Sequence, residues 1–417
     1  MATAGFNSSI QSELFEPSTY LQEGGNPGYF AVLWKDGTAI PHQVSYPLAA
    51  LAPVVETVNP AYDTWISQAT FVAKNRRAVS LRDVGLLFAD LDTYHIEGLR
   101  GVSPEAQANA LLAYCALEGL PAPSVVLYSG RGLQAKWLLD TAVSRGSILR
   151  WNEVQKALVH VLEGFGADRN ARDVSRVLRL EKTVNTKSGE LVRVVHVQGG
   201  AASGGVVRYE FEELAEKLLP RLPSPTPQEW ANAQEKGQTR ATGLTTATLD
   251  WARLEDIRTL WKLRGGVAEG FRELTLFWSM NFMMRASPVP LNQFWYEARA
   301  LAAEIYPGDF YRESDLSTVY RKALEYRSGA RVIYNGRQYP PLYTPRNDTL
   351  ADVVGITSDE EPYLRTIISE GEKVRRRREK RWAEGTTPRA KMPKNTRPWE
   401  AFGISRRTWY RRGCPTP

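Results

Sequence analysis

Residues 86–92 read Leu-Leu-Phe-Ala-Asp-Leu-Asp, an apolar run that leads directly into two carboxylates. A run of this length and composition predicts a buried strand. Because side chains alternate across a strand, Asp90 and Asp92 share one face, about 6 to 7 Å apart. Two acids on one face are costly to bury unless a cation lies between them, which favours a divalent metal. An isolated D-x-D is more often a pair of surface acids, so the rest of the chain decides.

Composition excludes several classes of protein. The chain has 417 residues, of which 43% are hydrophobic, and this length predicts two or three domains. No apolar run is long enough to cross a bilayer, and the N-terminus has no signal-peptide pattern, so no membrane partner is expected. Cys115 and Cys414 lie far apart without a C-x-x-C motif, which argues against a disulfide framework or a zinc module. We therefore expect a soluble, cytoplasmic protein.

The positive charge of the chain is concentrated at its end. The net charge is +7, but residues 371–417 hold 15 Lys or Arg against 4 Asp or Glu, a local +11. Residues 1–370 therefore sum to 7 − 11 = −4. This distribution is typical of a protein that binds nucleic acid through its C-terminal end.

The first half of the chain has the pattern of an α+β domain, predicted over residues 1–218. Strands are expected at 29–34, 65–72, 86–92, 124–128, 133–139 and 192–197. Helices are expected at 103–119, where Ser103 and Pro104 form a start signal, and at 151–166, where apolar residues recur at helical spacing.

Residues 124–139 predict a hairpin with a glycine-rich turn, Ser129-Gly130-Arg131-Gly132. On its second strand, Gln134 and Lys136 share one face. Glycines in such a turn let backbone N–H groups approach a phosphate, although most glycine-rich turns bind nothing. The turn is neither a Rossmann fingerprint nor a P-loop, since no helix start follows it and Gly-Lys never occurs in the chain.

Residues 166–187 are the most charged stretch of the first half. Asp168 and Asp173 lie there among four arginines, each able to neutralise an acid or hold a phosphate.

The second half predicts a linker at 219–248, a helical domain at 249–345, and two short helix-turn-helix-like segments. Within the helical domain, residues 249–329 contain no strand run. The first segment, 346–370, combines a short helix ended by Gly355 with a capping box at 357–360, and DNA binding and protein packing are equally open for it. A basic linker or helix, 371–396, leads to the second segment, 397–417, whose last helix is capped by Ser405. Its expected DNA-binding residues are Arg406, Arg407, Tyr410, Arg411 and Arg412.

Three elements occur in the order of the motifs of the archaeo-eukaryotic primase superfamily: Phe88-Ala-Asp90-Leu-Asp92, Ser129-Gly-Arg-Gly132 and Gly166-Ala-Asp168. The stretch from Asp168 through Arg179-Leu180 to Asn185-Thr-Lys187 especially resembles primases of mobilisable plasmids and related phage elements. The resemblance covers residues 25–210 and implies a primase-type catalytic domain, an RRM-like sheet with flanking helices, followed by an all-α domain and a helix-turn-helix tail. Two departures are Gln134, where many members have histidine, and the absence of a zinc module.

The resemblance implies a nucleotidyltransferase, a replication primase or primase-polymerase that uses Mg²⁺ or Mn²⁺. Asp90, Asp92 and Asp168 would hold two ions roughly 3.5 to 4 Å apart and act as the catalytic acids. The implied nucleotide-binding residues are Ser129, Gly130, Arg131, Gly132, Gln134, Lys136, Arg179, Asn185 and Lys187. The implied partners are a single-stranded DNA template, double-stranded DNA such as an origin, nucleoside triphosphates, and a separate helicase and polymerase.

Two other classes of function stay open at this point. A DNA-binding replication or copy-number regulator would need no buried carboxylate cluster, so the acidic motifs oppose it. A metal-dependent nuclease would use similar acids, and only an assay of nucleotide incorporation beside cleavage separates it from a primase.

Overall fold

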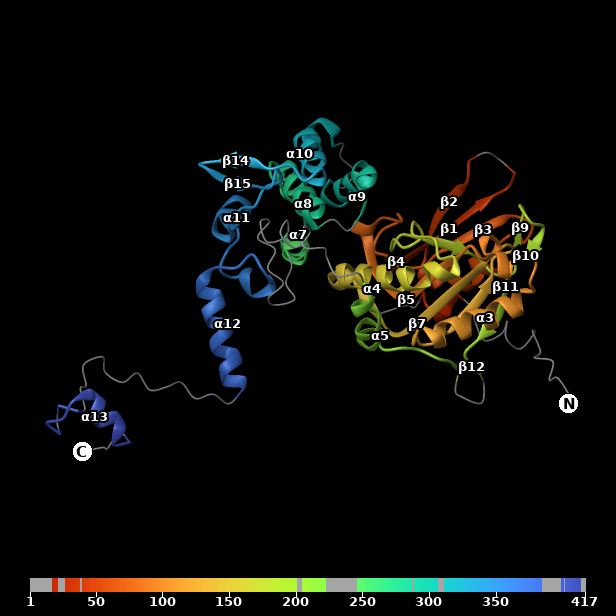
Figure 1. Cartoon of the computed structure of the whole chain (residues 1–417). Coiled ribbons are helices and arrows are strands. Elements are labelled where there is room, and N and C mark those ends of the chain that lie inside the picture. The colour runs from red at the N-terminus through yellow and green to blue at the C-terminus, as the bar shows by residue number, and fades with distance from the viewer. Residues whose placement is uncertain are drawn as a thin grey trace. The chain divides into compact units, whose positions relative to one another are not determined.

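The structure is a computed structural model that describes residues 17–21, 27–37, 40–200, 205–222, 246–286, 289–306, 311–384, 399–400 and 402–413 (Figure 1). It divides into two units, Met1–Ile367 and Ile368–Pro417. Among the described helices, none has the length and apolar composition needed to cross a membrane. The predicted linker around 223–245 and the basic stretch 385–398 lie outside the described residues.

Within the described residues, nine antiparallel strands form the central sheet of the first unit. The strand order is β11-β6-β7-β5-β4-β1-β3-β8, with β2 paired to β1. The strands are β1 Tyr29–Lys35, β2 His42–Pro47, β3 Asp63–Ser67, β4 Thr70–Phe71, β5 Leu81–Leu91, β6 Val125–Tyr128, β7 Leu133–Ser144, β8 Val177–Arg179 and β11 Arg193–Val197. Three short strand pairs accompany it: β9 Val184–Asn185 with β10 Glu190–Leu191, β12 Gly199–Gly200 with β13 Gly205–Val206, and β14 Val332–Tyr334 with β15 Arg337–Tyr339.

The expected strand at 65–72 is divided into β3 and β4. The Ser67 hydroxyl donates to the carbonyl oxygen of Ala69 (3.0 Å) and accepts from the N–H of Ala31 (3.1 Å). These two bonds fix a turn between the strands, which the apolar run alone does not signal.

The helices of the sheet region are α2 Leu51–Glu56, α3 Pro104–Leu117, α4 Ile148–Val161 and α5 Phe211–Leu218. Helix α3 begins as predicted, because the Ser103 side chain accepts a hydrogen bond from the N–H of Ala106 and Pro104 occupies the first turn. Helix α4 buries the residues at its predicted apolar positions, including Trp151, Val154 and Leu158. The predicted α+β class, an antiparallel sheet with flanking helices, is confirmed.

Side chains of helix α4 form hydrogen bonds with the backbone groups of β5 that have no strand partner. Strand β4 pairs with β5 only at its beginning, opposite Leu81 and Asp83, so the backbone of later residues needs other partners. The Trp151 indole N–H donates to the carbonyl oxygen of Leu86 (3.0 Å). The Gln155 side-chain amide makes two hydrogen bonds to the backbone of Phe88. It accepts from the N–H (3.2 Å) and donates to the carbonyl oxygen (2.6 Å). A buried helix side chain thus takes the place of a neighbouring strand.

The helical part of the first unit consists of α7 Thr246–Leu263, α8 Arg272–Ala286, α9 Phe294–Ile305, α10 Ser317–Arg327 and α11 Asn347–Val354. Among its aromatic residues, Trp261, Phe282 and Phe294 are buried. The described residues of 249–329 contain no strand, as predicted, but β14 and β15 form a hairpin after α10, in the rest of the predicted helical domain.

The helical part is joined to the sheet by buried polar contacts. The carboxylate of Glu297, which is 2% exposed, accepts from the backbone N–H groups of Ala78 (3.1 Å) and Val79 (2.9 Å), just before β5. Arg145 pairs with Glu255 at 2.8 Å.

Only the first half of the helix-turn-helix predicted at 346–370 is present. Helix α11 ends at Gly355 in the left-handed conformation, and Glu360 accepts from the N–H of Thr357 (2.9 Å), as in the predicted capping box. The second helix does not follow, because Pro362 cannot donate a helical hydrogen bond, and the chain makes a 3₁₀ turn at Glu361–Tyr363. The Asp256 carboxylate of α7 then accepts from the N–H groups of residues 365–367.

The second unit contains α12 Glu370–Ala383 and α13 Arg406–Arg411. Helix α13 forms the predicted last helix, with the Ser405 side chain accepting from the N–H of Thr408 (3.2 Å). The expected preceding helix at 397–404 is a turn in its described residues, closed by Gly403 at φ 59°.

We predict that Gln155→Leu lowers the free energy of unfolding by about 2 to 4 kcal/mol, because it leaves the N–H and the carbonyl of Phe88 buried without partners. Urea unfolding of this variant beside Glu153→Leu, an exposed position on the same helix, measures the effect. Equal stability of the two variants would show that Gln155 does not support the edge of β5.

Candidate active site

The third acidic motif continues the edge of β5 where α4 ends. The N–H of Asp168 donates to the carbonyl oxygen of Asp90 (2.9 Å), and the N–H of Asp92 donates to that of Gly166 (2.8 Å). Leu91 and Ala167 form the antiparallel bridge between these two bonds. Because α4 and its 3₁₀ extension lead directly to Gly166, the contacts that hold α4 on β5 also deliver Asp168 to the first two acids.

Two glycines allow this close packing around Asp92. A β-carbon on Gly132, in the hairpin turn, would overlap the carbonyl oxygen of Leu91. Gly166 has φ 82°, and a β-carbon there would lie 3.3 Å from the carbonyl group of Asp92. Asp92 is therefore held between the hairpin turn and the third motif.

The carboxylate of Asp90 is in an unfavourable environment for a negative charge. Burial, with the charges of Asp92 and Asp168, raises its pKa to about 6, although Arg176 and a hydrogen bond from Gln134 act in the opposite direction. Repulsion among the three acids indicates that they are close, and it creates a demand for positive charge.

The donor set suits a hard divalent cation, which prefers carboxylate and amide oxygens. The side-chain oxygen Oε1 of Gln134 is buried beside Asp90 without a hydrogen-bond partner and is available to such an ion or its water. In the described part of the chain, however, no three His, Cys, Asp or Glu side chains are arranged to hold one ion together. The backbone brings the acids to one place, and joint coordination by their side chains stays a proposal.

Gln134 and Lys136, which share one face as predicted, lie on the face of Asp90. Asp90 is opposite Gln134 and Phe88 is opposite Lys136 in the antiparallel pair of β5 and β7, and directly opposed residues share a face.

Lys136 is not exposed toward a ligand. Its side chain is 1% exposed, and its ammonium nitrogen lies 4.5 Å from the centre of the Tyr20 ring. Burial lowers its pKa to about 8, although the nearby Glu181 charge opposes this. A direct contact between Lys136 and a nucleotide would require the Tyr20 segment to move.

Arg131 and Tyr94 join the hairpin turn to the acids. The Arg131 guanidinium lies over the Tyr94 ring, 4.1 Å from its centre. Burial raises the pKa of Tyr94, and so does its hydrogen bond to Asp92. Tyr94 is not among the site residues predicted from the sequence, although it lies only two residues after Asp92.

Arg179 and Asn185 bind other parts of the protein. Arg179 pairs with Asp63 of β3 at 2.6 Å, and Asp63 also accepts from the N–H of Thr186 (3.1 Å). Burial raises the pKa of Asp63, but the hydrogen bonds from Thr186 and Arg179 outweigh it and leave the pKa below its ordinary value. Sequence analysis also missed Asp63, which no local motif marks.

The Asn185 amide donates to the carbonyl oxygen of Ser129 (2.8 Å), and its β-carbon is next to Gly130. The Asn185 side-chain oxygen also accepts from the N–H of Lys187 (3.2 Å). This asparagine supports the glycine turn, while the Lys187 side chain is exposed. The predicted tail residues, Arg406 to Arg412, belong to the separately described second unit.

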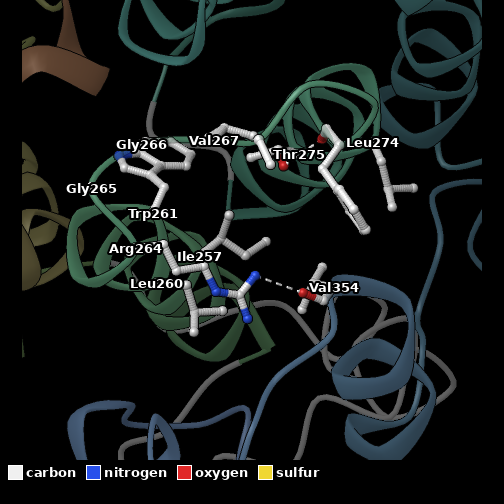
Figure 2. Close-up of a pocket in the computed structure, with 12 residues that line it drawn as sticks. Ile257, Leu260, Trp261, Arg264, Gly265, Gly266, Val267, Leu274, Thr275 and Val354 are labelled. Atoms are coloured by element: carbon white, nitrogen blue, oxygen red, sulfur yellow. Dashed lines mark hydrogen bonds between the residues drawn. The ribbon is translucent and has the colours of Figure 1, made fainter.

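A pocket of about 340 Å³ lies in the helical part (Figure 2). Its walls include Ile257, Leu260 and Trp261 of α7 and Val354 of α11, and the Arg264 guanidinium donates to the Val354 carbonyl oxygen (3.0 Å). None of its lining residues carries a carboxylate, so it lacks the chemistry of the acidic site.

No family model matches the chain. A replication protein of Clostridium perfringens is 26% identical over 311 residues, which are 73% of this chain and 68% of that protein. The AEP domain of the cyanophage S-2L primase-polymerase matches with 18% identity and a TM-score of 0.33, over 46% of this chain and 88% of the domain. The catalytic domain of the primase RepB′, solved in complex with initiator DNA, matches with 15% identity and a TM-score of 0.30, over 55% of this chain and 99% of the domain.

This chain is similar in sequence to a protein named a replication protein, which agrees with the role in replication that the three motifs imply. The TM-scores of the solved structures are below 0.5, so the role of each residue in this chain is inferred from its own geometry.

We predict that Asp90→Asn raises the free energy of unfolding at pH 8 by about 2 to 3 kcal/mol in the absence of divalent ions. The folded pKa of about 6 lies roughly two units above the ordinary value, so an ionised Asp90 destabilises the fold. Below about pH 3 the carboxyl is protonated in the folded and unfolded states alike, and variant and wild type should agree. As the pH rises from 4 to 6, wild-type stability should fall relative to the variant.

Urea unfolding at pH 4, 6 and 8 measures this dependence, with Asp359→Asn, an exposed acid, as control. If Asp90→Asn and wild type change in parallel over this range, Asp90 does not carry the repulsion described above.

Proposed function

We propose that this chain is a replication primase that adds nucleotides to a primer strand on a single-stranded DNA template. The observation that carries the proposal is the backbone pairing of Asp168 with Asp90, which gathers three acids at the end of one strand. The relative from Clostridium perfringens is named a replication protein, which supports a role in replication.

In this proposal Asp90, Asp92 and Asp168 hold Mg²⁺ or Mn²⁺. Such ions neutralise charge that develops during phosphoryl transfer and orient the reacting groups. The protein's part is to bring the carboxylates together, with Gln134 holding Asp90 in place.

Arg131 is the cation of the hairpin that is best placed to take the triphosphate, since it lies over Tyr94 beside Asp92. The glycine turn of Ser129, Gly130 and Gly132 would offer backbone N–H groups to the phosphates. Arg179 and Asn185 would act through the fold, by fixing β8 to β3 and by supporting the turn. Lys136 would contribute only after Tyr20 has moved, and the exposed Lys187 is free to reach a phosphate.

The second unit is the proposed duplex-binding part. Residues 368–417 hold 15 Lys or Arg against 5 Asp or Glu, a surplus of +10. In α13 the Arg406 guanidinium lies near the rings of Trp399 (5.6 Å) and Tyr410 (5.9 Å), which stabilises a compact basic segment. Arg407, Arg411 and Arg412 extend the basic surface toward phosphates or base edges, including those of an origin. A separate helicase and a separate polymerase would act with this chain.

We predict that Asp92→Asn and Asp168→Asn each reduce template-dependent incorporation by at least about 100-fold, because each removes a charge that the metal site needs. Asp173→Asn, in the same arginine-rich stretch as Asp168, should keep activity within about threefold of wild type. Primer synthesis on single-stranded DNA is measured with strand cleavage in parallel. Cleavage without synthesis would identify a nuclease, and neither activity would identify a binding protein.

We predict that replacing Arg406, Arg407, Arg411 and Arg412 together by glutamine weakens duplex binding and lowers the salt dependence of log K. Each phosphate that the tail no longer neutralises should reduce the slope by about 0.9, because fewer counterions are released. Synthesis on a single-stranded template should continue at saturating DNA. Duplex affinity measured from 50 to 200 mM salt tests this; unchanged affinity and slope would place the duplex-binding surface elsewhere.

A further inference from the structure

The hairpin of β14 and β15 exposes a large apolar and aromatic surface. Ile333 and Tyr334 are 72% and 67% exposed, and every residue of both strands is exposed. A two-stranded ribbon with both faces in water gains little stability from its own contacts. Exposed surface of this kind typically marks an interaction site.

The hairpin is presented from a fixed base. Asn281 of α8 is fully buried, and its amide pairs with the backbone of Tyr343, donating to the carbonyl (3.1 Å) and accepting from the N–H (2.9 Å). Lys322 of α10 donates to the carbonyl oxygen of Pro341 (3.1 Å). At the tip, Asn335 and Gly336 have φ of 49° and 71°, the signature of a tight two-residue turn. Figure 1 shows the two strands extending from the helices that hold them.

One face of the hairpin is an aromatic platform. Val332 is opposite Tyr339 and Tyr334 is opposite Arg337, so these four side chains share a face. Two phenol rings therefore lie on the same side of the ribbon as a guanidinium. Stacking on exposed rings beside a positive charge is the usual way in which proteins bind unpaired bases.

The charge of this stretch is also complementary to nucleic acid. Between Glu325 and Asp348 the chain has four arginines and no acid, a local +4 within a region, 1–370, that sums to −4. The Arg327 guanidinium already has a protein partner, since it donates to the carbonyl oxygen of Val289 (2.9 Å). Among the described residues, Arg331 and Arg337 make no ion pair, so both are available to phosphates.

We propose that the hairpin β14–β15 binds single-stranded DNA, with bases on Tyr334 and Tyr339 and phosphates at Arg331 and Arg337. Single-stranded DNA fits better than duplex because the faces of paired bases are covered by their neighbours in the helix. The absence of acids distinguishes this surface from one made for a basic protein partner. The proposal adds a template-contacting surface to the proposed function and does not depend on catalysis, since binding is measured without nucleotide.

The test compares the affinity of full-length variants for a labelled 20-nucleotide oligo-dT by fluorescence anisotropy. Replacing Tyr334 and Tyr339 together by alanine should weaken binding about tenfold or more, because the rings on which the bases stack are removed. Replacing both by phenylalanine keeps the rings and should leave affinity within about twofold. Tyr363→Ala removes a ring that is equally exposed, at 66%, outside the hairpin and should have no effect.

The same variants are measured with the four tail arginines replaced by glutamine, so that binding by the second unit does not mask the hairpin. Arg331→Gln and Arg337→Gln should each lower the salt slope for oligo-dT by about 0.7. Affinity for a 20-base-pair duplex should be unchanged by the tyrosine substitutions.

Three results would overturn the proposal. If the alanine variant binds oligo-dT as tightly as wild type in both backgrounds, the hairpin has no part in DNA binding. An equal loss of affinity for duplex and single strand would indicate that the hairpin contacts the DNA backbone and that the bases do not stack on its tyrosine rings. Unchanged DNA affinity with loss of self-association in sedimentation would assign the hairpin to contacts between copies of this chain.

Discussion

The acidic site depends on how the backbone groups along one edge of strand β5 form their hydrogen bonds. Strand β5 is paired with β7 along most of its length, but its other edge has a strand partner only at its beginning. If these buried backbone groups had no hydrogen bonds, the loss of free energy would exceed the net stability of many domains. Helix α4 and the residues that follow it supply the missing bonds, at Leu86, Phe88, Asp90 and Asp92 in turn.

This arrangement couples stability to chemistry. The two bonds at Asp90 and Asp92 bring Asp168 to the other two acids, and its charge adds to the effects of burial and of Asp92 in raising the pKa of Asp90. The fold therefore holds like charges together, and a cation at this point would relieve their repulsion. The hairpin turn is fixed to the same place by Gly132 and Asn185, so the acids and the turn form one packed assembly.

The sequence predicted what depends on local pattern. The acidic strand, the hairpin, α3, α4 and the helical region all follow from periodicity and capping signals. It could not show that Arg179 pairs with Asp63, more than 100 residues earlier, or that Tyr20 covers Lys136, because both depend on tertiary contacts. The helix predicted after residue 360 does not form, because Pro362 outweighs the capping box, and this proline can be seen in the sequence. Likewise, Asn335-Gly336 is a strong hairpin signal that was missed because each flanking strand has only three residues.

Binding of Mn²⁺, measured by electron paramagnetic resonance without nucleotide or DNA, tests most directly whether the three acids form one metal site. Wild type should bind Mn²⁺, and Asp168→Ala should weaken this binding at least about tenfold, as should Asp92→Ala, whereas Asp173→Ala should not. If Asp168→Ala binds Mn²⁺ as wild type does, the third motif is joined to the first only through the backbone, and the proposed metal site is wrong.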